Sequence, residues 1–129
     1  MQKNVLIIGN DVLTRDSLTL MLSQTGLELR VASNVAESMR IIWAKAPDVI
    51  VVDLDIPGVE LNQFAKEATR MNENVCVVAL VSSDLSKPQC EHADHVLRKP
   101  FAEIDVLRVM QACLCGHKKD DSDKKNNLA

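Results

Sequence analysis

Two apolar runs of this chain are each followed by a residue that could take part in phosphoryl chemistry. The run at residues 49–52 leads into Asp53, and the short apolar pair at residues 96–97 is followed two positions later by Lys99. In an open parallel α/β sheet, ligands bind in the crevice beyond the carboxyl ends of the strands. An aspartate and a lysine at the ends of two such strands predict a carboxylate that accepts a phosphoryl group, with a cationic partner.

Phosphoryl transfer to a carboxylate needs positive charge nearby. A carboxylate can attack phosphorus as a nucleophile, but the phosphoryl oxygens repel it. A lysine on one of these oxygens, and a divalent cation that bridges the carboxylate and the phosphoryl group, both offset this repulsion. Mg²⁺ is usually held by one or two carboxylates, with water and phosphate oxygens completing its octahedral shell. Residues with oxygen ligands near the same strand ends are therefore candidate metal ligands.

The composition predicts a single α/β domain with an aliphatic core. The chain has 129 residues, the size of one ordinary domain. It is 47% hydrophobic but only 2% aromatic, so the core must be aliphatic, which suits parallel strands buried on both faces. A net charge of -3 gives no electrostatic case for binding nucleic acid. No apolar stretch approaches the roughly 20 residues that span a bilayer, and no signal-peptide pattern is present. We therefore expect no membrane contact and a cytoplasmic location.

Apolar runs alternate regularly with segments of helical periodicity. The pattern predicts strands at residues 5–8, 27–31, 49–52, 75–81 and 96–97, and helices at residues 11–24, 35–46, 60–71 and 102–114. Residues 84–93 lack an apolar stripe and contain Pro88, so the fourth helix should be short or irregular. This alternation predicts a flavodoxin-like (βα)5 fold, a doubly wound parallel sheet with strand order 2-1-3-4-5. Residues 1–115 are assigned to this domain and residues 116–129 to a disordered tail or linker.

The four cysteines do not predict a disulfide framework, because the domain is of ordinary size and lacks a secretory signal. Cys76 lies within an apolar run and is interpreted as a small buried hydrophobic residue. Two further groups invite a zinc interpretation: Cys90 with His92, and Cys113 and Cys115 with His117. Their spacing fits no standard structural zinc site, so a zinc site is not favoured.

In their order along the chain, the strand-end residues resemble one known family. Pro47 and Asp48 precede a strand that ends in Asp53, Pro57 follows four residues later, and hydroxyl residues end the fourth strand before Lys99-Pro100. This set resembles the receiver domain of bacterial two-component response regulators, over about residues 3–115. The resemblance implies that a histidine kinase or phosphotransfer protein passes a phosphoryl group to an aspartate. The protein would then change a surface that binds an effector domain or partner protein, and a homodimer is left open. Such a domain is not an enzyme beyond self-catalysed phosphorylation and dephosphorylation.

The resemblance also implies roles for individual residues. Asp53 matches the phosphoacceptor, and Lys99 matches the lysine that holds a phosphoryl oxygen. Ser82, or less readily Ser83, matches the hydroxyl residue that follows the phosphoryl group. Asp55 matches a position that offers only its backbone carbonyl to Mg²⁺. Simpler structural roles remain open: Asp53 as a strand-end cap and Ser82 as a cap of the next segment.

The sequence departs from the family where the metal should bind. Receivers normally end the first strand with two acidic residues, but Gly9 and Asn10 occupy these positions here, and Asp11 follows one residue later. Asn10 can offer a carbonyl oxygen, and Asp11 is either a metal ligand or the N-cap of the first helix. We therefore expect a Mg²⁺ site formed by Asp53, Asn10, Asp11 and the Asp55 carbonyl to be weakened or lost.

The positions that relay phosphorylation to the partner-binding surface also differ from the family. Leu61 replaces a small residue, Val96 replaces an aromatic switch residue, and the fourth helix is degraded. The sequence leaves two functions open: a receiver phosphorylated on Asp53, and a pseudo-receiver that binds partners without phosphorylation. A flavodoxin-like enzyme finds no support, because the chain has no glycine-rich phosphate loop.

Overall fold

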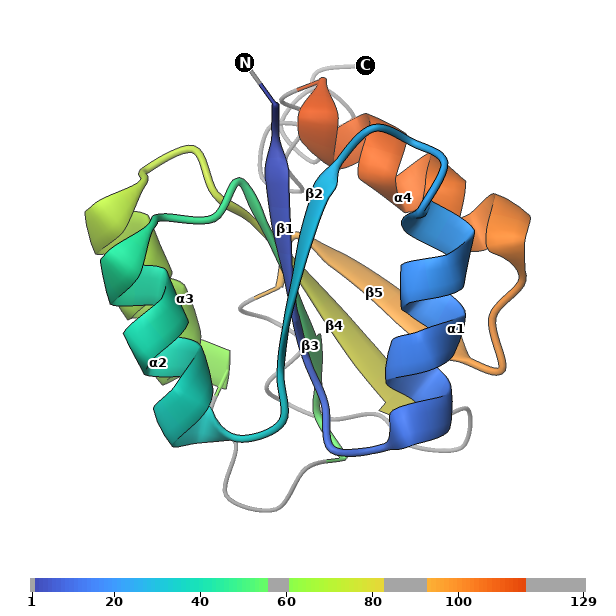
Figure 1. Ribbon diagram of the computed structural model, residues 1–129, viewed down its shortest axis with the longest axis horizontal. Coiled ribbons are helices and arrows are strands. Elements are labelled where there is room, and N and C mark those ends of the chain that lie inside the picture. The colour runs from blue at the N-terminus through green and yellow to red at the C-terminus, as the bar shows by residue number, and fades with distance from the viewer. Residues whose placement is uncertain (1, 56–60, 83–92, 116–129) are drawn as a thin grey trace, which may run out of the picture.

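Aliphatic runs form the centre of the fold in the computed structural model, which describes residues 2–55, 61–82 and 93–115. The strands are β1 (Asn4–Ile8), β2 (Glu28–Ala32), β3 (Val49–Asp53), β4 (Cys76–Ser82) and β5 (His95–Lys99). All pairs are parallel, and the strand order is β2-β1-β3-β4-β5 (Figure 1). The predicted flavodoxin-like sheet and its strand order are confirmed.

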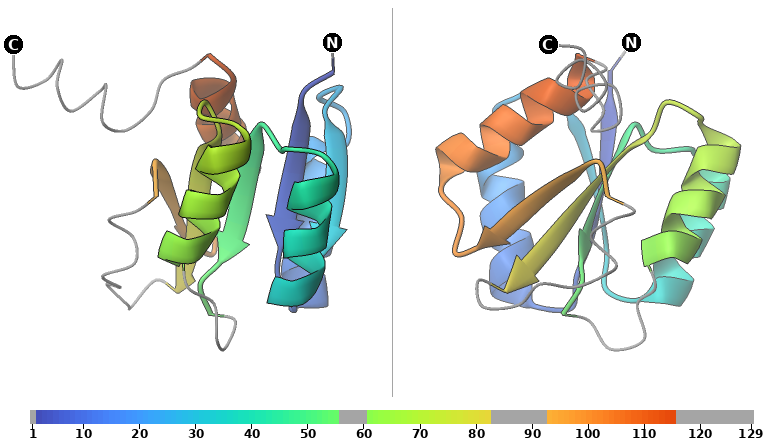
Figure 2. Two further views of the ribbon diagram at one scale, coloured as in Figure 1. Left: turned by 90° about the vertical axis from the view of Figure 1, so that its left-hand side faces the viewer. Right: turned by 180° about the vertical axis from the view of Figure 1, so that it is seen from behind.

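Four described helices cover the two faces of the sheet. They are α1 (Val12–Leu22), α2 (Val35–Ala44), α3 (Leu61–Met71) and α4 (Glu103–Leu114). The helices α1 and α4 lie on one face, and α2 and α3 lie on the other (Figures 1 and 2). The predicted fourth helix falls almost wholly on residues 83–92, which lie outside the described residues, as does the predicted tail at 116–129. Within the described residues, no helix is long and apolar enough to span a membrane.

The central position of β3 explains why residues 49–52 are all apolar. Val49 and Val51 pack in the cluster on the α1 and α4 side, whereas Ile50 and Val52 pack in the cluster on the opposite side. Because helices cover both faces, every residue of β3 is buried. The last residue of this strand, Asp53, is therefore held on a rigid part of the core.

Two helix starts follow from local side-chain capping. The carboxylate of Asp11 accepts hydrogen bonds from the Leu13 amide (3.2 Å) and the Thr14 hydroxyl (2.6 Å) at the start of α1. Asn34 accepts a hydrogen bond from the Glu37 amide (2.8 Å) at the start of α2. Both residues are thus N-caps, and of the two roles that the sequence left open for Asp11 the structure shows the cap.

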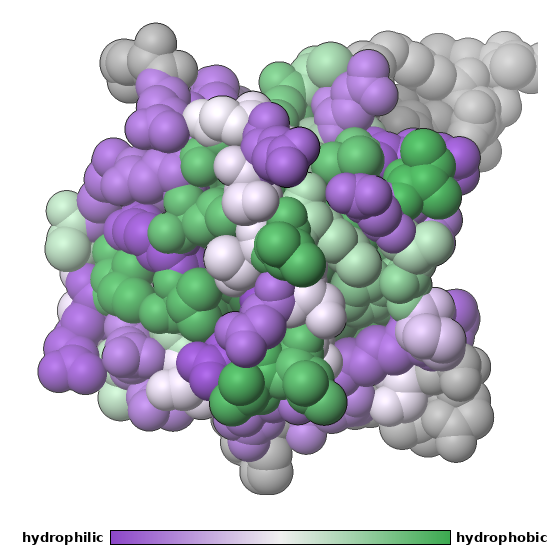
Figure 3. Space-filling model, turned by 45° about the vertical axis from the view of Figure 1, so that its right-hand side comes forward, coloured by the Kyte–Doolittle hydropathy of each residue, from purple (hydrophilic) through white to green (hydrophobic). Residues whose placement is uncertain are grey.

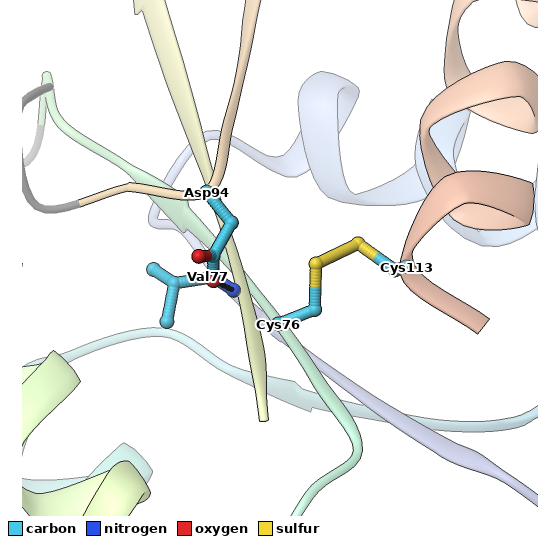
Figure 4. The surroundings of a disulfide bond; sticks show 4 residues. All are labelled: Cys76, Val77, Asp94 and Cys113. Atoms are coloured by element: carbon cyan, nitrogen blue, oxygen red, sulfur yellow. Dashed lines mark hydrogen bonds between the residues drawn. A yellow bond between two sulfur atoms is a disulfide. The ribbon is translucent and has the colours of Figure 1, made fainter. Parts of the chain in front are cut away.

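The expectation for the cysteines was wrong in one respect. Cys76 is buried as predicted, but it forms a disulfide with Cys113 that joins the start of β4 to the last turn of α4 (Figure 4). The two residues are 37 positions apart in the chain, and their Cα atoms lie 5.6 Å apart. The sequence alone does not reveal this proximity, because it depends on how α4 packs on the sheet.

Candidate functional site

The predicted chemical residues meet at one edge of the sheet. Asp53, Ser82 and Lys99 are the last residues of β3, β4 and β5. The strands are in register so that Ser82 lies beside Lys99, while Asp53 lies beside Leu80. Because parallel strands place their carboxyl ends at the same edge, three residues distant in sequence are brought into one site.

The strongest contact of this site is between Lys99 and Asp53. The Lys99 Nζ lies 3.0 Å from Asp53 Oδ1 and 2.9 Å from Asp53 Oδ2. The Asp53 side chain is 2% exposed, whereas that of Lys99 is 23% exposed. A buried carboxylate requires such a partner, because an unpaired buried charge is costly.

Asp55 takes part in this site through its side chain, which the sequence did not predict. Its Oδ2 accepts a hydrogen bond from the Ser82 hydroxyl (2.9 Å) and lies 3.0 Å from Lys99 Nζ. The Asp55 amide also donates to Asp53 Oδ1 (2.9 Å), which turns the chain just after β3. The signal was present in the pair of aspartates two residues apart, but only the structure shows that both carboxylates reach the same lysine.

The two carboxylates change the ionisation of the lysine. Burial disfavours the charged form of Lys99, but its hydrogen bonds to Asp53 and Asp55 and their negative charges outweigh this effect. The pKa of Lys99 is therefore raised above its ordinary value. The ammonium group is fully charged at neutral pH, and it can offer positive charge to an incoming anion.

The end of β1 lacks the acidic side chains of a strong metal site. Gly9 has no side chain, and a Cβ built there would lie 3.6 Å from both Asp53 Cβ and Arg15 Cγ. These are ordinary contact distances, so the position has room for a larger residue. Asn10 is exposed, and the Asp11 carboxylate is engaged in capping α1. Hydrogen bonding from Thr14 is the main cause that lowers the pKa of Asp11.

The donor set fits a weak rather than a strong Mg²⁺ site. The carboxylate of Asp53, the carbonyl of Asp55 and the side chain of Asn10 would supply oxygen ligands, which suit a hard cation. However, both oxygens of Asp53 are already bonded to Lys99, and Gly9 contributes no carboxylate. A cation would therefore compete with the Lys99 ammonium for Asp53.

The structure adds less about the other positions that the sequence analysis singled out. Val96 is 37% exposed on β5, and Leu61 begins α3. Ser83, the alternative hydroxyl residue, lies outside the described residues. The sequence-predicted site is thus represented by Asp53, Lys99 and Ser82, with Asp55 added by the structure.

Comparison with known proteins agrees with this fold. The response regulator receiver domain family matches residues 5–111 of the chain. The chain is 25% identical over 133 residues to the response regulator MprA of Mycobacterium ulcerans (strain Agy99), an alignment that covers 100% of this chain and 57% of that protein. The chain thus spans a little over half the length of the curated relatives it matches.

Solved structures share this fold. The chemotaxis response regulator CheY4 of Vibrio cholerae superimposes with a TM-score of 0.75 at 20% identity, covering 88% of this chain and 99% of that chain. A response regulator receiver modulated diguanylate cyclase from Pelobacter carbinolicus gives a TM-score of 0.73 at 26% identity, covering 94% and 98%.

The fold and the strand-end residues define a receiver domain. This chain belongs to the response regulator receiver domain family of two-component signalling. Response regulators interact with histidine kinases and effector domains, and their receivers typically bind Mg²⁺ at the phosphorylation site.

Proposed function

We propose that this chain accepts a phosphoryl group on Asp53 from the phosphohistidine of a histidine kinase or phosphotransfer protein. An Asp53 carboxylate oxygen attacks phosphorus, the phosphorus–nitrogen bond breaks, and the imidazole leaves with the bonding electron pair. The product is an acyl phosphate on Asp53 and a free histidine on the donor. The observation that carries the proposal is the contact of Lys99 Nζ with both oxygens of the buried Asp53.

Lys99 has the charge and the position to stabilise the transferred group. Its ammonium neutralises Asp53 in the resting state and would move to a phosphoryl oxygen once the acyl phosphate forms. Preorganised positive charge that faces the developing negative charge is an effective source of rate enhancement. The raised pKa of Lys99 keeps this charge in place at neutral pH.

Ser82 and Asp55 provide a switch in this proposal. In the resting state the Ser82 hydroxyl donates to Asp55 Oδ2, and the same oxygen contacts Lys99. Phosphoryl oxygens would attract both donors away from Asp55. Movement of Ser82 at the end of β4 would then change the partner-binding surface, as a shift between two populated states.

A divalent cation would be held by Asp53, the Asp55 carbonyl and Asn10, with Asp11 as a further carboxylate if it leaves its capping position. When bound, Mg²⁺ supplies positive charge to the phosphoryl oxygens. The missing carboxylate at Gly9 lowers the expected affinity, because one charge at about 4 Å contributes roughly 4 kcal/mol of gross attraction at an effective dielectric of 20. Water would recover much of this energy.

The surface beside the site suits a protein donor. A hollow of about 280 Å³ is lined by Leu13, Met21, Lys99 and Phe101, so it reaches the chemical edge of the sheet. On α1, Leu13 and Leu20 are more than 70% exposed (77% and 75%). Figure 3 shows hydrophobic groups among hydrophilic ones on the side of the molecule that carries α1. We propose that the donor protein docks on this side, in the cytoplasm, and that the output partner is an effector domain or a separate protein.

Intact mass spectrometry after incubation with acetyl phosphate tests the proposal. We expect one phosphoryl adduct that depends on Mg²⁺ and is absent from Asp53→Asn. A chain that forms no adduct with any divalent metal ion, while remaining folded, would contradict it.

The second candidate is a pseudo-receiver that binds partners without phosphorylation. Gly9 and Asn10 favour this candidate, because they remove both acidic residues from the end of β1. The same mass measurement separates the two functions, because only a working receiver forms the adduct.

A further inference from the structure

Three side chains that can bind a metal ion gather at the opposite edge of the sheet. They are Cys76 on β4, His95 on β5 and Cys113 on α4, and their ligand atoms all lie within 4.8 Å of one another. Figure 4 shows the two cysteines facing each other between the strand and the helix. Cys76 and His95 begin their strands, whereas Asp53, Ser82 and Lys99 end theirs. Across the seven residues of β4 the two edges are roughly 20 Å apart.

The sheet register places Cys76 and His95 on the same face of the sheet. His95 pairs with Val78 on the neighbouring strand, and Cys76 lies two residues before Val78. Residues two apart on a strand point to the same face, so Cys76, Val78 and His95 all face α1 and α4. On α4, Val106, Met110 and Cys113 form the buried stripe that packs against this face. Cys113 is therefore directed at the strand starts.

A pair of hydrogen bonds fixes the start of β5 beside β4. The Val77 amide donates to Asp94 Oδ2 (2.8 Å), and the Asp94 amide donates to the Val77 carbonyl (2.7 Å) (Figure 4). Each partner is adjacent in sequence to a member of the cluster. The positions of Cys76 and His95 are thus set by hydrogen bonds that do not involve the sulfur atoms.

The cluster is sheltered but not sealed. Cys76 is 1% exposed and Cys113 is 9% exposed, while His95 is half-buried. A cavity of about 220 Å³ beside the cluster is lined by Cys113 together with Asp48, Asn72 and Asn74. Cys113 therefore lies in the wall of a largely polar cavity, which Lys3 and Leu114 complete.

We propose that the reduced form of this cluster is a binding site for a borderline-soft divalent metal ion such as Zn²⁺. A reductant such as a phosphine or a dithiol supplies two electrons and cleaves the Cys76–Cys113 bond, which gives two thiols. Metal binding then releases one proton from each thiol, so that two thiolates and the neutral His95 imidazole bind the ion. Thiolate and imidazole suit zinc, whereas Mg²⁺ prefers oxygen ligands.

The donor set defines the kind of site. Three protein ligands leave the fourth tetrahedral position of zinc to water or to an external ligand. The disulfide and the metal exclude each other, because both use the same two sulfur atoms. A bound metal ion therefore protects Cys76 and Cys113 from oxidation, and oxidation releases the ion.

Cobalt titration of the full chain tests this site, because a Co²⁺–thiolate bond absorbs light by charge transfer. The chain is first reduced with a phosphine, which is then removed under argon. We expect one equivalent of Co²⁺ to produce the thiolate absorption, and Zn²⁺ to displace it. The oxidised wild-type chain, which carries the disulfide, is expected to produce none.

Single variants then test the ligand set. Cys76→Ser and Cys113→Ser should each weaken Co²⁺ binding at least tenfold, and so should His95→Gln. Cys115→Ser is the matched control, because Cys115 is a free, exposed cysteine on the same helix end, and it should bind Co²⁺ as the wild type does. Circular dichroism checks that each variant is folded.

Two results would overturn the proposal. One is a reduced, folded wild-type chain that gives no thiolate absorption with Co²⁺. The other is absorption that survives in folded His95→Gln with unchanged affinity or disappears in Cys115→Ser, since either would place the metal on different residues. The wild-type comparison of reduced and oxidised chains needs no substitution, so it decides the question even if a cysteine variant fails to fold.

Discussion

Lys99 Nζ lies within 3.0 Å of both carboxylate oxygens of Asp53, although the two residues are 46 positions apart in the chain. The contact joins the ends of β3 and β5 across the end of β4. It pairs Lys99 with Asp53, which is more deeply buried than Asp55. Most properties that we expect of the site follow from this pair.

Replacing Lys99 by methionine should destabilise the fold. The substitution keeps most of the side-chain volume but leaves Asp53, which is 2% exposed, without this cationic partner. Breaking a fully buried pair costs about 3–5 kcal/mol, and the 23% exposure of Lys99 reduces this to about 1–3 kcal/mol. Urea unfolding measures the difference, with the exposed Lys66→Met as control. Asp53→Asn should recover part of the loss in the double variant, and equal stability of Lys99→Met and wild type would contradict the expectation.

Replacing Asp55 by asparagine should speed phosphorylation by acetyl phosphate. Its carboxylate engages Lys99 and Ser82 and repels an incoming phosphoryl group. A partly exposed ion pair contributes up to about 1 kcal/mol, which corresponds to roughly fivefold in rate. The adduct seen by mass spectrometry is followed over time, with Asp16→Asn as a control of equal charge change. A slower reaction in Asp55→Asn would instead indicate that this carboxylate assists the metal.

Introducing an acidic residue at position 9, as in the family pattern, should strengthen Mg²⁺ binding. The Cβ at this position meets only ordinary contacts of 3.6 Å or more, so Gly9→Asp is tolerated sterically. Without metal the new carboxylate lies near Asp53 and lowers the melting temperature, and Mg²⁺ should raise it again by preferential binding to the folded chain. We expect at least a tenfold gain in affinity from the Mg²⁺ dependence of Tm. Gly9→Ala adds the Cβ alone and should show no gain, so a similar gain there would refute the carboxylate explanation.

Reduction of the disulfide should lower stability in the absence of added metal. Cys76 and Cys113 close a loop with a sequence separation of 37, and the chain-entropy account gives roughly 4 kcal/mol for a loop of this size. We expect a loss of about 2–4 kcal/mol in urea unfolding when a phosphine is added. Cys115→Ser should respond to reduction as the wild type does. An unchanged midpoint would show that the cross-link does not limit unfolding.

Above neutral pH, the contribution of Lys99 to stability should change only in the alkaline range. Burial opposes the charged form, but Asp53 and Asp55 outweigh it and raise the pKa in the folded state. The stabilisation is therefore present in full below the unfolded lysine pKa of about 10.4, and it is lost as pH rises through the folded pKa. The difference in unfolding free energy between wild type and Lys99→Met should stay constant from about pH 7 to 9 and shrink above about pH 10.5. A difference that shrinks between pH 7 and 9 would exclude the raised pKa.

Much of the fold is determined by local sequence. The aliphatic runs and amphipathic segments predict which residues form strands and helices, and their regular alternation predicts the parallel sheet and its strand order. The caps at Asp11 and Asn34 are equally local, since side chain and amide lie within three residues. Asp53 and Lys99 could be chosen as site residues because Asp53 directly follows a long apolar run, and Lys99 follows a short one by two positions and precedes Pro100.

Tertiary structure decided which of these groups touch. The side chain of Asp55 joins Lys99 and Ser82 only because β3, β4 and β5 end at one edge. The Cys76–Cys113 bond and its neighbour His95 depend on the register of β5 and on the packing of α4. Spacing along a chain sets the direction of a side chain within its own element, whereas contacts between elements arise from the packing of the whole core. For that reason the strand ends could be read from the sequence, but the cluster of Cys76, His95 and Cys113 could not.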